Sequence, residues 1–507
     1  MPPEKTVSPA HGALDPKRWQ ALFFIALAQL MVVLDGTIVN IALPSAQTDL
    51  GISDGNRQWV ITAYALAFGG LLLFGGRVAD LWGRRRAFVV GLIGFALASA
   101  LGGAASNEAM LYLSRALQGV FGALLAPAAL SLLTILFTDA KERAKAFGVF
   151  GAIAGAGAAI GLLLGGALTD YLDWRWTFYV NIPFAVIAAV GAMMYINEPE
   201  NARNRSTLDI PGAVLASLGL VALVYGFARA EHEDWTESVT VTMFVAAAVL
   251  LAAFVIVESR VKSPLLPLRV VTDRNRGGAY AALGLAIVGM FGLFLFLTYY
   301  LQVVRGYSPV KTGVAFLPMV AGMIIGSTQI GARLVTRVPA RMLMVPGFLV
   351  ASLGMLLLTQ LSIDTSYAAV IMPAQVLLGL GMGTAFMPAM SLATERVKPT
   401  DAGVAGAMVN VSQQVGGAIG IALLNTIAAS ATTAYVTDHA AGSTNERLLV
   451  LESMVHGYTT AIWWAFFIVL GSAVVSALLI NSKGSGHGTD ASGEGSDEGA
   501  PIPVMVH

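Results

Sequence analysis

Asp35 is the only acidic residue that lies deep inside a long apolar run, in the segment LMVVLDGTIVNIALP. A carboxylate in hydrocarbon costs several kcal/mol, so such a group is protonated or kept away from lipid. We interpret Asp35 as a site that binds and releases a proton and faces a central cavity. The alternative is a carboxylate that is held in a structural hydrogen-bond network.

A cationic residue, Arg115, lies in another apolar run, LYLSRALQGVFGALLAP. A guanidinium does not lose its proton in proteins, so it needs carboxylate or carbonyl acceptors. Beside a carboxylate it also changes the proton affinity of that group. Arg115 is therefore a candidate for proton coupling together with Asp35, or else a structural clamp between helices.

The segment GGRVADLWGRRR joins two apolar runs through a very short basic loop. Its acidic residue can cap the N-terminus of another helix, and its arginines can pair with acidic groups or anionic lipid. Contacts of this kind form in one conformation and break in another. Beyond a positively charged anchor, we therefore expect a conformational latch made by Gly76, Asp80, Gly83 and Arg84.

Small residues recur at a spacing of four in the run FGVFGAIAGAGAAIGLLLGGAL. This spacing lets two helices approach closely, and it also suits a helix that bends or slides. The predicted packing or hinge residues are Gly151, Gly155, Gly157, Gly161 and Gly165.

Neutral polar side chains are also scattered through the apolar runs. A cavity lined by neutral polar, methionine and aromatic groups suits bulky amphipathic ligands, although any single one can instead bond a neighbouring helix. The candidate cavity-lining residues are Asn40, Gln118, Gln302, Asn410, Gln413 and Gln414.

The elements that position these residues are apolar runs long enough to cross a membrane. The 507 residues are 56% hydrophobic and 12% charged, about half the charged fraction of a soluble domain, which argues against a water-soluble enzyme. A membrane-spanning helix needs about 20 mainly apolar residues. Fourteen runs qualify: 19–43, 57–79, 86–105, 109–137, 144–168, 177–196, 209–230, 239–258, 277–302, 311–335, 341–361, 367–392, 403–430 and 457–481.

The basic residues predict the orientation of these runs. If the N-terminus is inside and all fourteen runs cross, 23 of the 30 Lys and Arg residues fall in inner segments and 6 in outer ones. This is the bias of the positive-inside rule, and it places both termini in the cytoplasm. Twelve spans with two interfacial helices are the alternative. The first run is a retained span rather than a signal peptide, because no small-residue cleavage site follows it.

No catalytic or metal-binding pattern is visible in the sequence. There is no cysteine, and the six histidines are scattered. Motifs of metalloproteases, serine hydrolases and phosphate-binding loops are also missing. The net charge of zero gives no reason to expect nucleic acid. We therefore expect no enzyme activity, no cofactor and no metal, and a transport process driven by an ion gradient.

Several motifs together resemble the major facilitator superfamily, specifically the fourteen-span drug:proton antiporters of the EmrB/QacA branch. They are LDGTIVNIALP, GGRVADLWGRRR, RALQG, WRWTFYVNIP, PLLPL and YYLQVVRGYSP. Gly76, Asp80, Gly83 and Arg84 fall on the superfamily's loop signature, and Arg115 is the arginine that the family links to proton transfer. Leu162 departs from the family pattern, because that position after Gly161 usually carries proline.

The resemblance implies an all-helical membrane fold with two six-helix bundles and two inserted helices. We expect a cytoplasmic segment 1–18, a first bundle 19–196, an inserted part 197–276, a second bundle 277–481 and a disordered tail 482–507. The implied protein is a monomer in the bacterial cytoplasmic membrane, surrounded by lipid. It would export bulky hydrophobic or amphipathic compounds by proton-driven alternating access. Export of an endogenous lipid, siderophore or self-made antibiotic is an alternative, as is a membrane sensor or scaffold without transport.

Overall fold

The computed structural model of the protein is built from long helices. It describes residues 16–137, 140–198, 209–232, 235–261, 264–335, 337–394, 402–440 and 445–481, and none of these forms a β-strand. The all-helical prediction is therefore confirmed for the described chain. The predicted tail 482–507 and most of segment 1–18 lie outside it.

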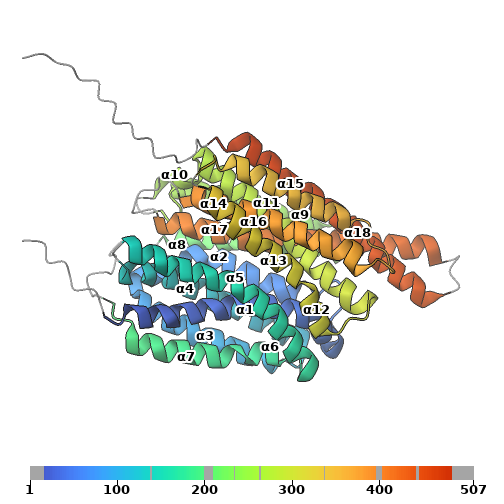
Figure 1. The fold of residues 1–507 in the computed structure, drawn as a ribbon, viewed down its shortest axis with the longest axis horizontal. Helices are drawn as coiled ribbons and strands as arrows, with labels where there is room; N and C mark the ends of the chain where they lie inside the picture. The colour runs from blue at the N-terminus through green and yellow to red at the C-terminus, as the bar shows by residue number, and fades with distance from the viewer. Residues whose placement is uncertain are drawn as a thin grey trace, which may run out of the picture.

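The first seven helices pack against one another in the lower part of Figure 1. α1 lies against α5 and α7, α2 against α4, and α3 against α4 and α7. Their bounds are α1 Arg18–Leu50, α2 Trp59–Trp82, α3 Arg84–Gly103, α4 Glu108–Leu136, α5 Ala140–Tyr171, α6 Trp176–Tyr179 and α7 Asn181–Tyr195.

The next two helices, α8 (Ile210–His232) and α9 (Ser238–Arg260), pack against each other. α8 also contacts α2 of the first group and α17 (Ala402–His439) of the last group. The Ser217 hydroxyl donates to the Gly70 carbonyl at 2.8 Å, and the Thr426 hydroxyl donates to the Phe227 carbonyl at 3.3 Å. α8 is thus bonded to both groups of helices.

Most of the remaining helices form a second group in the upper part of Figure 1, where α17 and α18 extend beyond the others, whereas α12 lies lower, against α5. α11 lies against α17 and α18, and α15 lies against α16 and α18. Three short segments with π-helical geometry, η2 to η4, interrupt or precede α-helices. The bounds are α10 Leu268–Val271, α11 Arg274–Tyr299, η2 Tyr300–Val304, α12 Pro309–Ala315, α13 Leu317–Ile325, η3 Gly326–Gly331, α14 Ala332–Leu334, α15 Arg341–Leu358, η4 Tyr367–Ile371, α16 Met372–Thr394 and α18 Glu446–Leu479.

Local sequence explains where several helices begin and end. The side chain of Asn107 accepts the Met110 N–H at 2.9 Å and caps α4, and Asp273 caps α11 through the Arg276 N–H at 2.9 Å. Such caps satisfy backbone donors that the first helical turn leaves free. Gly83, with φ at 107°, makes the turn between α2 and α3, where a left-handed conformation favours glycine.

The number of membrane spans is confirmed only in part. Among the described residues, twelve helices are long and apolar enough to cross a membrane. In α2 and α5, only the stretches Trp59–Leu72 and Ile160–Tyr171 belong to the described residues that were counted. The structure therefore supports a multi-pass membrane protein with about twelve spans, and the count of fourteen stays a prediction.

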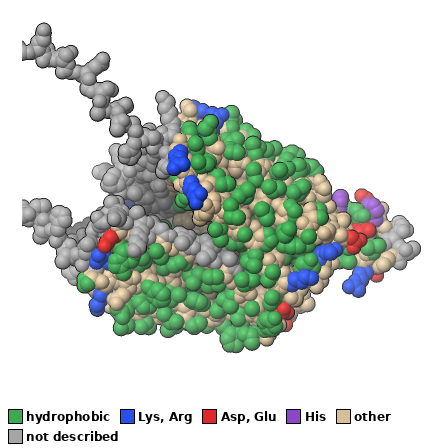
Figure 2. Space-filling model, viewed as in Figure 1, with side chains coloured by type: hydrophobic (Ala, Val, Ile, Leu, Met, Phe, Trp, Pro, Cys, Tyr) green, Lys and Arg blue, Asp and Glu red, His purple; other side chains and the backbone are tan. Residues whose placement is uncertain are grey.

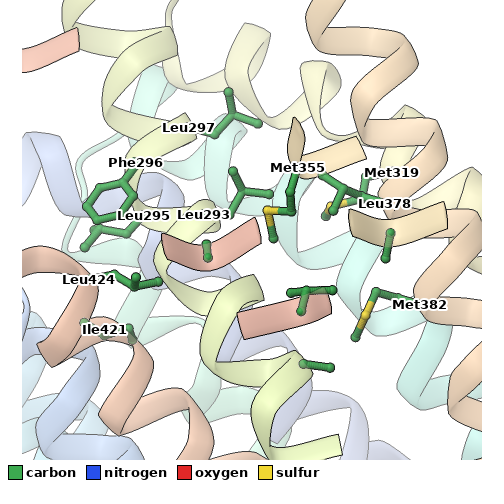
Figure 3. Packing of buried hydrophobic residues seen from close by; sticks show 14 of the residues in the cluster. Leu293, Leu295, Phe296, Leu297, Met319, Met355, Leu378, Met382, Ile421 and Leu424 are labelled. Atoms are coloured by element: carbon green, nitrogen blue, oxygen red, sulfur yellow. The ribbon is translucent and has the colours of Figure 1, made fainter. Parts of the chain in front are cut away.

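The molecule is apolar on its sides as well as in its core. Figure 2 shows hydrophobic side chains over most of the visible face, with charged groups gathered near its two ends. This pattern fits helices that are surrounded by lipid. Inside the second group, Figure 3 shows Phe296 of α11, Met355 of α15, Leu378 of α16 and Leu424 of α17 among the side chains of one cluster. α1 to α7 contribute most of a separate cluster.

Candidate functional site

Asp35 lies in the middle of α1 and is fully buried inside the first group of helices. Its Oδ2 accepts a hydrogen bond from Arg115 Nη1 of α4 at 2.7 Å. Its Oδ1 accepts from Gln118 Nε2 and from Asn181 Nδ2 of α7, both at 2.8 Å. Both carboxylate oxygens are therefore bonded to donors, as a buried charge requires.

Arg115 is 1% exposed and is the largest of the fully buried side chains among the described residues. Its Nε donates to the Val60 carbonyl of α2 at 2.8 Å, and its Nη1 also donates to Gln118 Oε1 at 2.6 Å. The guanidinium lies 4.5 Å from the ring centre of Tyr64, which adds a cation–π contact. Arg115 thus joins α1, α2 and α4 around one ion pair.

The side-chain amides of Gln118 and Asn181 connect the ion pair to α3 as well. Gln118 Nε2 donates to the Ser99 hydroxyl at 2.8 Å, and Asn181 Nδ2 reaches the same hydroxyl at 3.4 Å. All of these side chains are buried. The result is a closed polar network in a low-dielectric interior, where the loss of one member is costly.

Asp35 and Arg115, the two residues predicted to couple protons, form a direct ion pair. Proton coupling itself stays a prediction. Asp35 does not face an open cavity in this conformation, since its side chain is 0% exposed. The hydrogen-bond network that we considered as the alternative is present. Gln118 belongs to this network rather than to a cavity lining.

The other candidate cavity residues lie in different places. Asn40 Nδ2 bonds the Gly36 carbonyl of its own helix at 2.8 Å. Gln302 Nε2 bonds the Ile41 carbonyl of α1 at 2.9 Å, so it joins the two groups of helices. Asn410, Gln413 and Gln414 are half-buried on α17.

A groove between α15 and α18 contains none of the candidate cavity residues. It is lined by Pro339, Arg341, Met342, Val345, Pro346, Ala477, Ile480 and Asn481.

Three of the predicted packing glycines lie directly against α1. A β-carbon at Gly157 would lie 3.0 Å from Val33, one at Gly165 would lie 3.0 Å from Ile38, and one at Gly161 would collide with the Thr37 hydroxyl. The side-chain surroundings of Gly151 and Gly155 lie outside the described part of the structure. The small-residue stripe of α5 therefore packs on the helix that carries Asp35.

The predicted latch region contains an acidic partner that the sequence did not reveal. Glu198 accepts the backbone N–H of Arg84 at 2.9 Å and of Arg85 at 3.1 Å, at the N-terminus of α3. The Arg84 guanidinium is 3.9 Å from the same carboxylate. Gly76 lies against Pro127 of α4, and the side chain of Asp80 is outside the described set. These contacts lie within the first group of helices rather than across the two groups.

Contacts between the two groups gather near the C-terminal end of α1. The guanidinium of Arg57, which is 5% exposed, lies 4.1 Å from the ring centre of Tyr299 in α11 and donates to Asn425 Oδ1 of α17 at 3.5 Å. The Tyr299 hydroxyl bonds Gln47 of α1.

The helices α5 and α12 touch at the same end of the bundle. A β-carbon at Gly166 of α5 would lie 2.7 Å from the Pro309 carbonyl, and one at Gly313 of α12 would collide with the Leu162 carbonyl. The two groups are therefore closed against each other here.

Sequence reasoning missed several members of the network. Asn181 has a signal in the sequence, since it lies within WRWTFYVNIP, but that motif does not show what Asn181 bonds. Ser99 and the Val60 carbonyl have no distinguishing sequence pattern. Arg57 looked like one of a few outer basic residues, and only the packing reveals its burial.

The chain is similar to known proteins along most of its length. The family described as the Major Facilitator Superfamily matches residues 25–421. The puromycin resistance protein of Streptomyces alboniger is 55% identical over 471 residues, which cover 92% of each chain. The cephamycin export protein CmcT of Amycolatopsis lactamdurans is 37% identical over 414 residues, which cover 81% of this chain and 85% of that protein.

A similar solved structure is the crystal structure of a bacterial homolog of the human lysosomal transporter Spinster, in an inward-facing and occupied conformation. It matches with a TM-score of 0.64 and 16% identity, and the match covers 92% of this chain and 97% of that chain. At this identity the likeness concerns the fold alone.

Proposed function

This chain belongs to the Major Facilitator Superfamily, and from that premise we propose that it is an antibiotic exporter that uses the entry of protons to drive export. Its relatives include proteins named for puromycin resistance and cephamycin export. The 55% identity to the puromycin resistance protein makes puromycin the first compound to test. Substrates of this class are small amphipathic molecules. Moving them across the membrane needs neither an enzymatic reaction nor a cofactor.

The proposed topology has fourteen spans in the bacterial cytoplasmic membrane, with both termini in the cytoplasm. α2 and α5, with 24 and 32 residues, supply the two spans beyond the twelve. At 1.5 Å per residue, the shorter of them is about 36 Å long, which exceeds a hydrocarbon core of about 30 Å. We assign residues 19–196 and 277–481 to the two bundles and residues 197–276 to the inserted part. We propose that the protein works as a monomer.

The observation that carries the proposal is the buried ion pair between Asp35 and Arg115. A buried pair is not needed for stability, because packed apolar residues often serve as well. Its presence in a membrane helix instead favours a role in which the charge changes. When Asp35 takes up a proton, it no longer attracts Arg115, and the guanidinium keeps Val60 and Gln118 as acceptors.

α1 is the element that would transmit this change. It carries Asp35, and towards its C-terminal end it bonds the second group of helices through the Ile41 carbonyl and through Gln47. Its contact with α5 is lined by glycines, so few side chains resist a shift of one helix along the other. Release from Arg115 therefore frees α1 to shift along α5, which lets the two bundles change their relative position.

In the proposed topology, these contacts close the outer side of the transporter. Asp35 is fully buried in this conformation, so we place proton uptake in the alternative, outward-open conformation. Export then follows alternating access: the substrate leaves and Asp35 takes up a proton while the outer contacts are open, and Asp35 releases the proton to the inside after these contacts have closed.

The test is the movement of protons in liposomes that contain the purified protein and a pH-sensitive dye. With a pH gradient imposed, puromycin should trigger proton flux in the wild type, and Asp35→Asn should abolish the flux. Asp49→Asn is the matched control, because Asp49 also lies on α1 in an ion pair but is 46% exposed. Puromycin movement that ignores the pH gradient in both the wild type and Asp35→Asn would refute proton coupling. Failure to move puromycin or other antibiotics at all would refute the export function.

A further inference from the structure

A second pair of ionisable groups lies far along the chain from Asp35, on the inserted helices. Asp209 immediately precedes α8 and is 4% exposed, and Glu258 lies in the last turn of α9 and is 3% exposed. Both are carboxyl groups, and ionised carboxylates are rarely this buried unless they are paired with cations.

Each carboxyl group has one oxygen that is bonded to the backbone. Asp209 Oδ1 accepts the Gly212 N–H at 2.9 Å in the first turn of α8. Glu258 Oε2 accepts the Leu266 N–H at 3.0 Å from the segment after α9. This segment contains PLLPL, a motif that transport itself does not explain. The backbone therefore holds both groups in fixed positions.

The second oxygen of each group has no donor. Asp209 Oδ2 and Glu258 Oε1 are buried without a hydrogen-bond partner. Both oxygens lie beside Gly212, at 2.7 Å and 2.6 Å from the position that a β-carbon on this residue would take. The two carboxyl groups therefore meet at this glycine. Two carboxylates cannot bond each other, whereas a carboxylic acid can donate to a carboxylate.

The elements that pack on α8 and α9 carry few charged residues. Arg77 and Asp80 lie on α2, Arg260 ends α9 and Arg269 lies on α10, and the charged residues of α17 lie at its opposite end. Within the described ranges, no cation forms an ion pair with Asp209 or Glu258. Two adjacent buried carboxyl groups without a cation do not both ionise.

We propose that Asp209 and Glu258 together bind one proton, at a second proton site on the inserted helices α8 and α9. The proton lies on Glu258 Oε1 or on Asp209 Oδ2 and bonds the other oxygen, so that all four oxygens are satisfied. The ionised form of Asp209 is stabilised more than that of Glu258, because Asp209 lies at the N-terminus of α8, where the helix dipole favours negative charge. Glu258 therefore carries the proton, and it releases the proton to water when the pair ionises fully.

Loss of this proton would leave two negative charges beside each other and push the carboxyl groups apart. The affected structure is the start of α8 and the segment after α9. α8 packs on α2 and on α17, which belong to different bundles. The site would therefore make the contact between inserted and core helices depend on the pH at this end of the bundle, which the proposed topology places in the cytoplasm. This last step rests on the proposed function, whereas proton binding itself does not.

The experiment is infrared spectroscopy of the purified protein over a series of pH values, with the carboxylic-acid C=O band as readout. Asp35→Asn serves as the background, because Asp35 is the other buried carboxyl residue among those that the structure describes. In this background we expect one acid band that is lost at high pH. Glu258→Gln and Asp209→Asn should each abolish it. Glu258→Gln should fold, because its amide supplies the N–H that Asp209 Oδ2 otherwise receives from the shared proton.

A variant that keeps both carboxyl groups provides a sharper test. Gly212→Ala places a methyl group between the two oxygens and should remove or shift the shared-proton band. Gly471→Ala is the matched control, because a β-carbon there meets nothing within 4 Å. Persistence of the band in both Glu258→Gln and Asp209→Asn would overturn the proposal, as would its absence from the background at every pH. Loss of the band on adding Ca²⁺ at constant pH would show a metal site instead. None of these results depends on transport activity.

Discussion

The ion pair between Asp35 and Arg115 allows a quantitative test of how burial sets the strength of a charge pair. The two groups are 2.7 Å apart and are 0% and 1% exposed. Asp35→Asn leaves an unpaired buried guanidinium, and Arg115→Met leaves an unpaired buried carboxylate. Each single variant should lower the free energy of unfolding by about 3–5 kcal/mol.

The double variant should cost much less than the sum of the two single variants. With both charges removed, no unpaired charge is left in the interior, and only amide hydrogen bonds are weakened. The coupling energy between the two positions should therefore be about 3 kcal/mol. The assay is unfolding by denaturant in mixed micelles, followed by tryptophan fluorescence.

The ion pair between Asp49 of α1 and Arg175 serves as the control for this double-mutant cycle. Asp49 and Arg175 are 2.8 Å apart, but their side chains are 46% and 30% exposed. Water screens such a pair, so its coupling energy should be about 0.2–1 kcal/mol. If both cycles gave the same small coupling, burial would not control the strength of the Asp35–Arg115 pair, and the reasoning from this geometry would be refuted.

Two further variants test the helix contacts. Gly161→Ala should lower stability by about 1–3 kcal/mol, because the new methyl group collides with Thr37. Adding Thr37→Ala should restore most of the loss, and unfolding that is unchanged by the second substitution would contradict this contact. Arg57→Ala removes a buried cation that contacts Tyr299 and Asn425 across the two groups of helices. The Arg57→Ala substitution should lengthen the mean distance between spin labels on loops 51–58 and 305–308. The sequence has no native cysteine to interfere with labelling. An unchanged distance distribution would show that Arg57 does not help to hold the two groups of helices together.

Much of the candidate site was predictable because a charge in an apolar run is conspicuous. Asp35 and Arg115 were each singled out because a charged residue is rare in an apolar run, and they form a direct ion pair. The stripe of Gly157, Gly161 and Gly165 was also identified from its spacing, and these glycines pack on α1. In both cases, the sequence pattern reflects a constraint of the membrane interior itself.

Other parts of the site could not be predicted, because their partners are distant in the chain. Glu198 lies 114 residues from Arg84, and nothing in its sequence neighbourhood indicates that it caps α3. Gln118 looked like a cavity residue, because an amide in an apolar run is equally suited to a ligand or to a carboxylate. Asp209 and Glu258 attracted no attention, since each lies at the edge of its apolar run, where charged residues are common.

The sequence by itself determined that this is an all-helical membrane protein, because lipid forces the backbone of each apolar run to satisfy its own hydrogen bonds. The motifs further identified its family before any geometry was known. Only the tertiary structure decided that Asp35 is enclosed by α3, α4 and α7 rather than open to a cavity. It also decided that Arg57 is buried against the other bundle and that two carboxyl groups meet at Gly212. The physical reason is that hydrophobicity specifies how far a segment enters the membrane, whereas the partners of a buried polar group depend on how separate helices pack.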